Sequence, residues 1–173
     1  MKYLPYDQIT IHSPLSISQI NQKLRKHLSD RPWWKMGGVA PNTYRGNLYS
    51  QHFNISRIIN YRNSFLPQIR GEMSSTPYGS LVKLTFRLPL IASCFMMLWM
   101  GGVSFALIVI MIGLFTDPSV DFNLFMLAPV AMLLFGYLLT LLGFKAESNP
   151  SIAFFQELLE HQKEFVDNNT GLT

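Results

Sequence analysis

The sequence has few of the residues on which small enzymes and disulfide-bonded proteins depend. Cys94 is the single cysteine among 173 residues, which excludes an internal disulfide and a zinc site built from cysteine pairs. The four histidines lack metal-ligand spacing, and no phosphate-binding loop, dinucleotide-binding motif or serine-nucleophile motif occurs. We therefore expect a non-enzymatic protein with no catalytic residue, no metal and no cofactor. A lone general base at His12, His52 or His161 is the alternative.

Charged residues are also scarce, and this scarcity comes from one part of the chain. Asp, Glu, Lys and Arg make up 14% of the sequence, against about 25% in soluble domains. Residues 1–87 nevertheless carry twelve Lys or Arg and three acids, a net charge of +9. Residues 88–144 carry no Lys or Arg and two acids, and residues 145–173 have a net charge of −3. The chain is therefore divided into a basic region, an apolar region and an acidic tail.

The apolar region contains two long runs without charge. Residues 88–115 and 122–144 are uncharged over 28 and 23 residues, and about 20 apolar residues span a bilayer as a helix. Residues 116–121 between them include a proline and two acids, which is typical of a turn. Because backbone groups in lipid must bond internally, the two runs predict a transmembrane α-helical hairpin. A pair of buried core helices is the alternative.

Basic residues beside the two runs predict the orientation of the hairpin. Lys83 and Arg87 precede the first run, Lys145 follows the second, and the turn has no Lys or Arg. Basic residues remain on the cytoplasmic side, so we expect both termini in the cytoplasm and the turn outside. Residues 1–14 lack the apolar stretch of a signal peptide, which agrees with this orientation. The predicted location is the cell (inner) membrane, crossed twice.

Small residues within the two runs predict where the helices touch, because small side chains let helix backbones approach closely. The predicted contact residues are Gly101, Gly102, Ala106, Ala131 and Gly136. A seam between copies of the chain is the alternative use of these residues. Neither run contains an ionisable side chain of the kind that lines ion pathways, which argues against a pump made of this chain alone.

Alternating patterns in the basic region predict an α+β fold with a small antiparallel sheet on the cytoplasmic side. Residues 8–12 and 80–88 alternate apolar and polar side chains, as strands do. Residues 15–28 have the apolar periodicity of a helix, and Ser16 with Gln19 matches a capping box at its start. We expect four or five strands beside this one helix. The other strand candidates are residues 33–36, 43–53, 54–61 and 66–73, and a loop is expected at 74–79.

Arg57 falls on the apolar face of a predicted strand. Phe53 and Ile55 share that face, because alternate strand residues point the same way. A buried guanidinium without a partner is costly, so Arg57 requires one. Three partners are open: Glu72, an acid of the C-terminal helix, or a bound anion.

The candidate contacts for an anion or a partner protein are Arg57, Tyr61, Arg62, Asn63 and Arg70. Together with the basic residues beside the membrane, the charge of +9 favours anionic lipid headgroups. The basic residues are spread along the region and match no nucleic-acid-binding motif, so no nucleic-acid partner is expected.

The stretch around Tyr61 resembles a widespread family of uncharacterised bacterial membrane proteins. That family has a YRNSFLP-like signature, a Gly-Thr-like strand start, an Arg-Leu-Pro-like approach to the membrane and two transmembrane helices. The matching elements here are residues 61–67, Gly79-Ser80 with Ser in place of Thr, and Arg87-Leu88-Pro89. The resemblance covers residues 44–115 and implies a two-helix membrane protein, but no substrate, cofactor or catalytic residue.

The acidic tail has the pattern of an amphipathic helix. Asn149 followed by Pro150 is typical of a helix start, and apolar residues recur with helical spacing as far as Asp167. The polar face of this helix is acidic, whereas helices that lie on anionic membranes have basic polar faces. We therefore expect residues 145–173 to dock on residues 1–87, with the hairpin as an insertion between them.

Three functions remain open at this point. The first is a non-enzymatic accessory, assembly or scaffold protein that is anchored in the bilayer and binds a partner protein. The second is a membrane-proximal sensor of an anionic ligand or lipid headgroup. The third is a homo-oligomeric channel or transporter component.

Overall fold

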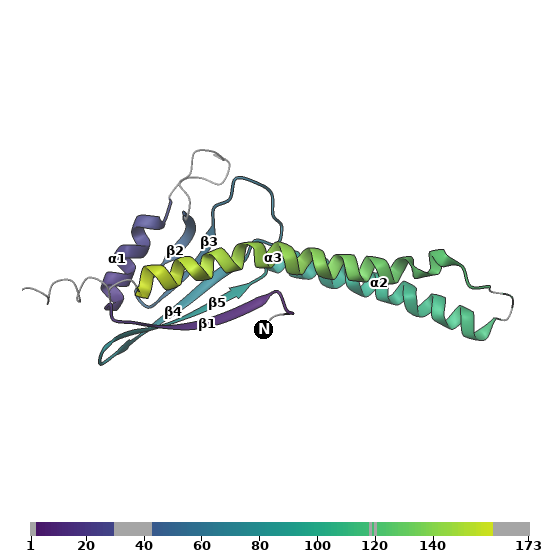
Figure 1. Cartoon of the computed structure of the whole chain (residues 1–173), viewed down its shortest axis with the longest axis horizontal. Coiled ribbons are helices and arrows are strands. Elements are labelled where there is room, and N and C mark those ends of the chain that lie inside the picture. Colours follow the sequence, from purple (N-terminus) through teal and green to yellow (C-terminus); the bar gives the residue numbers. More distant parts are fainter. Residues whose placement is uncertain (1–2, 30–42, 118, 120, 161–173) are drawn as a thin grey trace, which may run out of the picture.

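The computed structural model describes residues 3–29, 43–117, 119 and 121–160 of the chain. One antiparallel sheet carries helices on one of its faces, and two long helices project from it as a hairpin (Figure 1). The fold is therefore α+β with a small antiparallel sheet, as the sequence predicts. The strand predicted at residues 33–36 and the tail helix beyond residue 160 lie outside the described residues.

The five strands pair in the order β1-β5-β4-β3-β2, which makes β1 and β2 the edges of the sheet. The strands predicted at residues 8–12 and 80–88 are confirmed, whereas the loop predicted at 74–79 is wrong. A turn of only two residues, Pro77 and Tyr78, joins β4 to β5. Gly79, which follows the turn, adopts a φ of 135° that a side chain would strain. The bounds are β1 Tyr6–Ser13, β2 Tyr44–Leu48, β3 His52–Arg57, β4 Gln68–Thr76 and β5 Gly79–Arg87.

One face of the sheet is apolar and covered, and the other is polar and open. The strand register places Phe53, Gly71 and Leu84 in one row on the covered face. The Phe53 ring fills the space above Gly71, where an added Cβ would lie 2.1 Å from the ring. Lys83 and Arg70 belong to the alternate set of strand residues and are exposed on the opposite face. The alternation predicted for β5 is therefore confirmed.

Helix α1 (Ile17–His27) covers part of the apolar face. Ser16 and Gln19 form the predicted capping box: the Ser16 side chain accepts from the Gln19 backbone, and the Gln19 side chain accepts from the Ser16 backbone. The apolar face of this helix buries Ile20 and Leu24 in the core. The predicted helix and its start are both confirmed.

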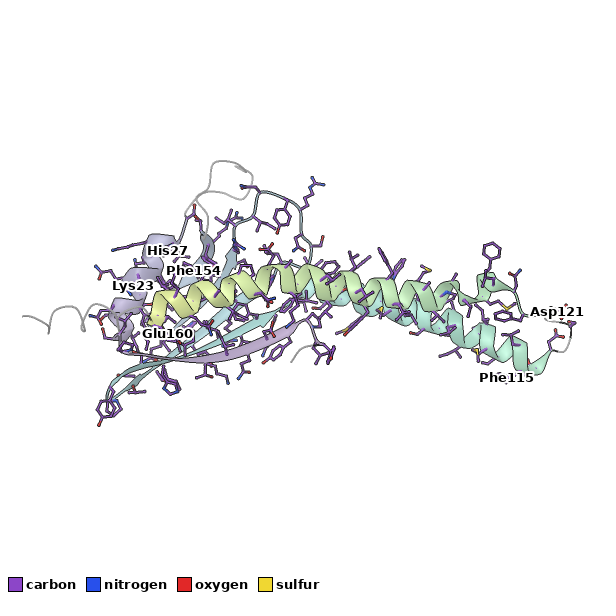
Figure 2. All side chains as sticks on the ribbon, viewed as in Figure 1. Lys23, His27, Phe115, Asp121, Phe154 and Glu160 are labelled. Atoms are coloured by element: carbon purple, nitrogen blue, oxygen red, sulfur yellow. The ribbon has the colours of Figure 1, made fainter. Side chains whose placement is uncertain are left out.

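The hairpin consists of α2 (Leu90–Thr116), the short 3-10 turn η1 (Leu124–Leu127) and α3 (Ala128–Glu160). Both long helices are apolar enough to cross a membrane. The 27 residues of α2 extend about 40 Å, more than the roughly 30 Å of a hydrocarbon core. Within α2, all of which is described, only Ala92 is buried. Figure 2 shows the side chains of this hairpin pointing outward along its length, with Phe115 and Asp121 at its far end.

Helix α3 is continuous from the hairpin to the face of the sheet. The helix start predicted at Asn149-Pro150 is therefore wrong, and the expected boundary at 144/145 falls inside α3. A proline inside a helix costs about 3 kcal/mol, and its missing N–H leaves the carbonyl of Ala146 without a donor. Ala146, Asn149 and Pro150 all lie on the exposed side of α3, where water can bond to that carbonyl. The buried contacts on the opposite side of the helix outweigh the remaining cost.

Those buried contacts complete the core of the sheet. Phe154, Phe155 and Leu159 of α3 pack with residues of α1 and all five strands. The Phe154 ring stands edge-on to His27 at 5.0 Å between ring centroids, and both lie where the end of α3 meets α1 (Figure 2). Phe155 is stacked on Phe53 at 5.9 Å. Each buried aromatic side chain contributes about 2 kcal/mol of hydrophobic stabilisation.

The predicted contact between α2 and α3 is correct at Gly136 and wrong at both glycines of α2. Gly136 is buried, and an added Cβ would lie 3.4 Å from Trp99 Nε1. Gly101 and Gly102 face outward with nothing within 4 Å of an added Cβ. Ala106 and Ala131 are also exposed. The larger side chains of Trp99 and Met100 make the helix contact, because α2 turns them rather than its glycines toward α3.

Candidate functional site

Two oppositely charged residues of α3, Lys145 and Glu147, mark the level at which the hairpin meets the sheet. Lys145 Nζ donates to both carboxylate oxygens of Asp7 at 2.7 Å. The Ser148 hydroxyl donates to the same carboxylate at 3.1 Å. Asp7 lies on edge strand β1, so these contacts fix one side of α3 to that edge of the sheet. The basic residue predicted to lie beside the membrane is thus also an ion-pair partner within the fold.

Glu147 makes the second ion pair, with β3 on the other side of the sheet. Its side chain is only 2% exposed, and its Oε2 accepts from Arg57 Nη1 at 3.2 Å. The Tyr61 hydroxyl donates to its other oxygen, Oε1. An acid of the C-terminal part of the chain is therefore the partner of Arg57. Glu72, the other candidate, lies on the open face of the sheet and is paired with Arg70 at 3.4 Å.

The segment that links β3 to β4 is attached to α3 one turn before Glu147. The Asn63 side-chain amide donates to the Gly143 carbonyl at 2.8 Å, and its Oδ1 accepts from the Phe65 backbone at 2.9 Å. Gly143 permits this approach, because an added Cβ would lie 2.9 Å from the Phe65 ring. Three residues of the Tyr61–Pro67 motif therefore contact α3. We call Arg57, Tyr61, Asn63, Gly143 and Glu147 the α3 clamp.

Tyr44 lies beneath the α3 clamp and is 1% exposed. Its register partner is Arg57, and its ring packs against Phe155 at 5.7 Å between centroids. Burial disfavours the phenolate and raises the pKa of Tyr44 above 10.0, although the Ser151 hydroxyl and the Arg57 charge act in the opposite direction. The phenol therefore remains neutral at physiological pH.

The far end of α3 is held by the N-terminal part of the chain. The Ser13 hydroxyl donates to the Leu159 carbonyl at 2.8 Å, and Lys23 Nζ donates to the Leu158 carbonyl at 3.1 Å. Helix carbonyls carry partial negative charge toward the C-terminal end of a helix, so a lysine beside them is stabilising. Helix α3 is thus held at both ends of its sheet-bound half.

A groove lies beside the α3 clamp, between β2, β3 and residues 58–67. Its volume is about 620 Å³. Arg45, Arg57 and Arg62 line it together with several amide and hydroxyl side chains. No Asp or Glu is among its lining residues in the described part of the chain. The groove can therefore accept an anionic group.

The structure brings only some of the predicted contact residues together. Arg57, Tyr61 and Asn63 meet at the α3 clamp, and Arg62 lines the groove beside them. Arg70 lies apart, on the open face of the sheet.

Sequence reasoning missed Asp7, Gly143 and Glu147. The one local signal was the Lys-Ala-Glu sequence at 145–147, which places two opposite charges directly after a long uncharged run. A helix that was expected to start only at Asn149 left Glu147 in a linker, where no partner was sought.

Comparison with protein-family models, with curated proteins and with solved structures finds no match to this chain. The family resemblance of residues 61–67 therefore stays a prediction. Among the described residues, no group of three or more His, Cys, Asp or Glu side chains is placed to hold a metal ion.

Proposed function

We propose that this chain is a non-enzymatic integral membrane protein that anchors a small α+β module at the bilayer surface and presents it to a partner protein. The observation that carries the proposal is the apolar hairpin, whose surface the rest of the described chain leaves uncovered. Its second helix, α3, continues into the core of the α+β module and so joins the hairpin to that module. An apolar surface of this length is costly in water, and a bilayer removes that cost. An accessory or scaffold role follows, because the anchor fixes the position of the module.

The proposed orientation places the sheet and both termini on the cytoplasmic side of the cell membrane. Lys83, Arg87 and Lys145 support it, because they lie at the sheet end of the hairpin. The turn at the other end of the hairpin has only Asp117 and Asp121 as charged residues. Asp117 is fully exposed, and its hydrogen bonds from Ser119 lower its carboxyl pKa, so it remains charged at neutral pH.

The open face of the sheet is the proposed binding surface for the partner. Arg45, Arg70, Lys83 and Arg87 are exposed on this face, and Glu72 is the acid among them. No helix covers this face in the described part of the chain. The excess of positive charge favours an acidic protein surface as the partner, because complementary charge steers association and fixes orientation.

Photocrosslinking in membranes of the source organism tests this function. A photoreactive residue in place of Lys83 is expected to give one discrete protein adduct, whereas the same residue in place of Gln156, on the exposed side of α3, gives none. Charge reversal by Arg70→Glu is expected to remove the adduct. An adduct that is unchanged by Arg70→Glu, or that forms equally from both positions, would show that the open face is not the binding surface. Extraction of the chain by alkaline carbonate would contradict membrane insertion.

A further inference from the structure

The groove beside the α3 clamp contains positive charge that the fold does not neutralise. The charge of Arg57 is neutralised by Glu147, whose Oε2 lies 3.2 Å from Arg57 Nη1. Arg45 and Arg62 are exposed and form no ion pair with any acid of the described residues. Two arginines therefore line one open cavity without a counter-charge from the described residues.

The remaining lining of the groove divides into donors and an apolar wall. Asn54, Asn60 and Ser64 supply amide and hydroxyl donors next to the arginines. Ile58, Ile59 and Leu66 supply the apolar part. An anionic oxygen group with a short apolar extension matches this combination, because guanidinium forks bind phosphate oxygens in pairs.

The groove lies at the end of the sheet from which the hairpin projects. Arg45, Ser56, Gln68 and Arg87 form one row across four strands. The first three line the groove, and Arg87 is the register partner of Gln68. Arg87 directly precedes the two residues that lead into α2. Asn63, also a lining residue, is bonded to α3 at Gly143. In the proposed topology this level of the molecule is that of the lipid headgroups.

We propose that the groove is a binding site for a phosphate ester, with Arg45 and Arg62 as its charged binding residues. The site goes beyond the proposed scaffold function, because it takes a phosphate ester rather than a protein. It shares Arg45 with the proposed partner surface, but neither Arg70 nor Lys83, on which the test of that surface depends. Arg57 serves as a positioning residue, since its pairing with Glu147 holds the base of the groove against α3. The phosphate ester is either the headgroup of an anionic phospholipid or a soluble small molecule, and the two sources share the same chemistry.

Lipid retention by the full chain in nanodiscs tests the site. The nanodiscs contain phosphatidylcholine and phosphatidylglycerol, and the lipids retained on the released protein are counted by native mass spectrometry. We expect the wild-type chain to retain phosphatidylglycerol and the Arg45→Gln/Arg62→Gln variant to retain at least about tenfold less, because two charge-assisted bonding groups are lost. Both arginines are exposed and form no ion pair with the described residues, so the variant is expected to fold.

The matched control is Arg70→Gln/Lys83→Gln, which removes the same charge from exposed positions outside the groove. It is expected to retain phosphatidylglycerol as the wild-type chain does. Equal loss in the two double variants would overturn the site, because retention would then follow net charge alone.

A second arm distinguishes the two sources of the phosphate ester. Glycerol 1-phosphate is titrated by calorimetry into the chain in nanodiscs of phosphatidylcholine alone. Binding that requires Arg45 and Arg62 would assign a soluble ligand, whereas its absence together with selective retention of phosphatidylglycerol would assign a lipid headgroup. If the wild-type chain neither retains phosphatidylglycerol nor binds glycerol 1-phosphate, the proposal is overturned. That result would leave the scaffold function unaffected.

Discussion

Arg57 and Glu147 form an ion pair at 3.2 Å although they are 90 positions apart in the sequence, with the whole of α2 and the turn of the hairpin between them. Glu147 is the more deeply buried partner, at 2% exposed against 22% for Arg57. The pair therefore joins strand β3 of the sheet to helix α3, the second helix of the hairpin. Because it is buried, the loss of one partner matters more than the loss of an exposed pair.

Removing the carboxylate of Glu147 is expected to destabilise the module. Glu147→Ala leaves the Arg57 guanidinium and the Tyr61 hydroxyl without their acceptor, at a cost of about 3 kcal/mol in the free energy of unfolding. The midpoint of denaturant unfolding in detergent measures the change. Glu72→Ala is the control, because the Arg70–Glu72 pair is exposed and its loss is expected to cost less than about 0.5 kcal/mol. Equal effects of the two variants would contradict a stabilising role for the buried pair.

Gly143→Ala is expected to loosen the attachment of the β3–β4 segment to α3. The added Cβ would lie 2.9 Å from the Phe65 ring, and overpacking of this kind costs about 1–3 kcal/mol. Gly102→Ala is the matched control, because nothing lies within 4 Å of its Cβ and alanine is the better helix former. Thermal unfolding in detergent is expected to shift downward for the first variant and not for the second. An equal downward shift of the unfolding temperature in both variants would show that the β3–β4 segment does not pack tightly on Gly143.

Stability is expected to fall as the pH rises above 10, and Tyr44 is expected to carry part of that loss. The pKa of Tyr44 is raised in the fold, so above pH 10 the unfolded chain releases the phenolic proton first and unfolding is favoured. Below pH 10 this contribution to stability is fully present. Unfolding measured from pH 8 to pH 11 is expected to show a smaller loss for Tyr44→Phe than for the wild-type chain. Identical pH profiles would mean that the phenol ionises in the fold as freely as in water.

Cysteine labelling tests the proposed topology in a Cys94→Ala background. Asp117→Cys is expected to react with a membrane-impermeant maleimide added to intact cells, because Asp117 is at the end of the hairpin remote from the basic residues. Lys83→Cys is expected to react only after permeabilisation. The reverse pattern would place the sheet outside and contradict the charge rule on which the orientation depends.

The local patterns of the sequence predicted much of the fold. Ser16 and Gln19 marked the start of α1 because a capping box needs only neighbouring residues. Val82, Leu84 and Phe86 marked the buried face of β5 because strand alternation is also local. The uncharged runs likewise gave α2 and the first part of α3 to within a few residues.

The features that the sequence did not predict depend on contacts between distant residues. Pro150 has every local property of a helix start, yet α3 passes through it because Glu147 and Phe155 on either side are buried against the sheet. The outward direction of Gly101 could not be predicted, since the rotation of α2 about its axis is set by Trp99 packing beside Gly136. The sequence correctly indicated that Arg57 needs a partner. Glu147 could be identified as that partner only from the position of α3 in the structure.

The continuity of α3 has a consequence for biosynthesis. The strands are complete in the nascent chain by residue 87, whereas Phe144, Phe154, Phe155 and Leu159, which close their apolar face, are translated only after α2 and the turn. The sheet can therefore reach its final packing only once the ribosome has released the second half of the hairpin. In a chain that inserts as proposed, the module would fold only after the hairpin has inserted correctly. If the second helix of the hairpin failed to return to the cytoplasmic side, the apolar face of the sheet would stay uncovered and the chain would be open to proteolysis.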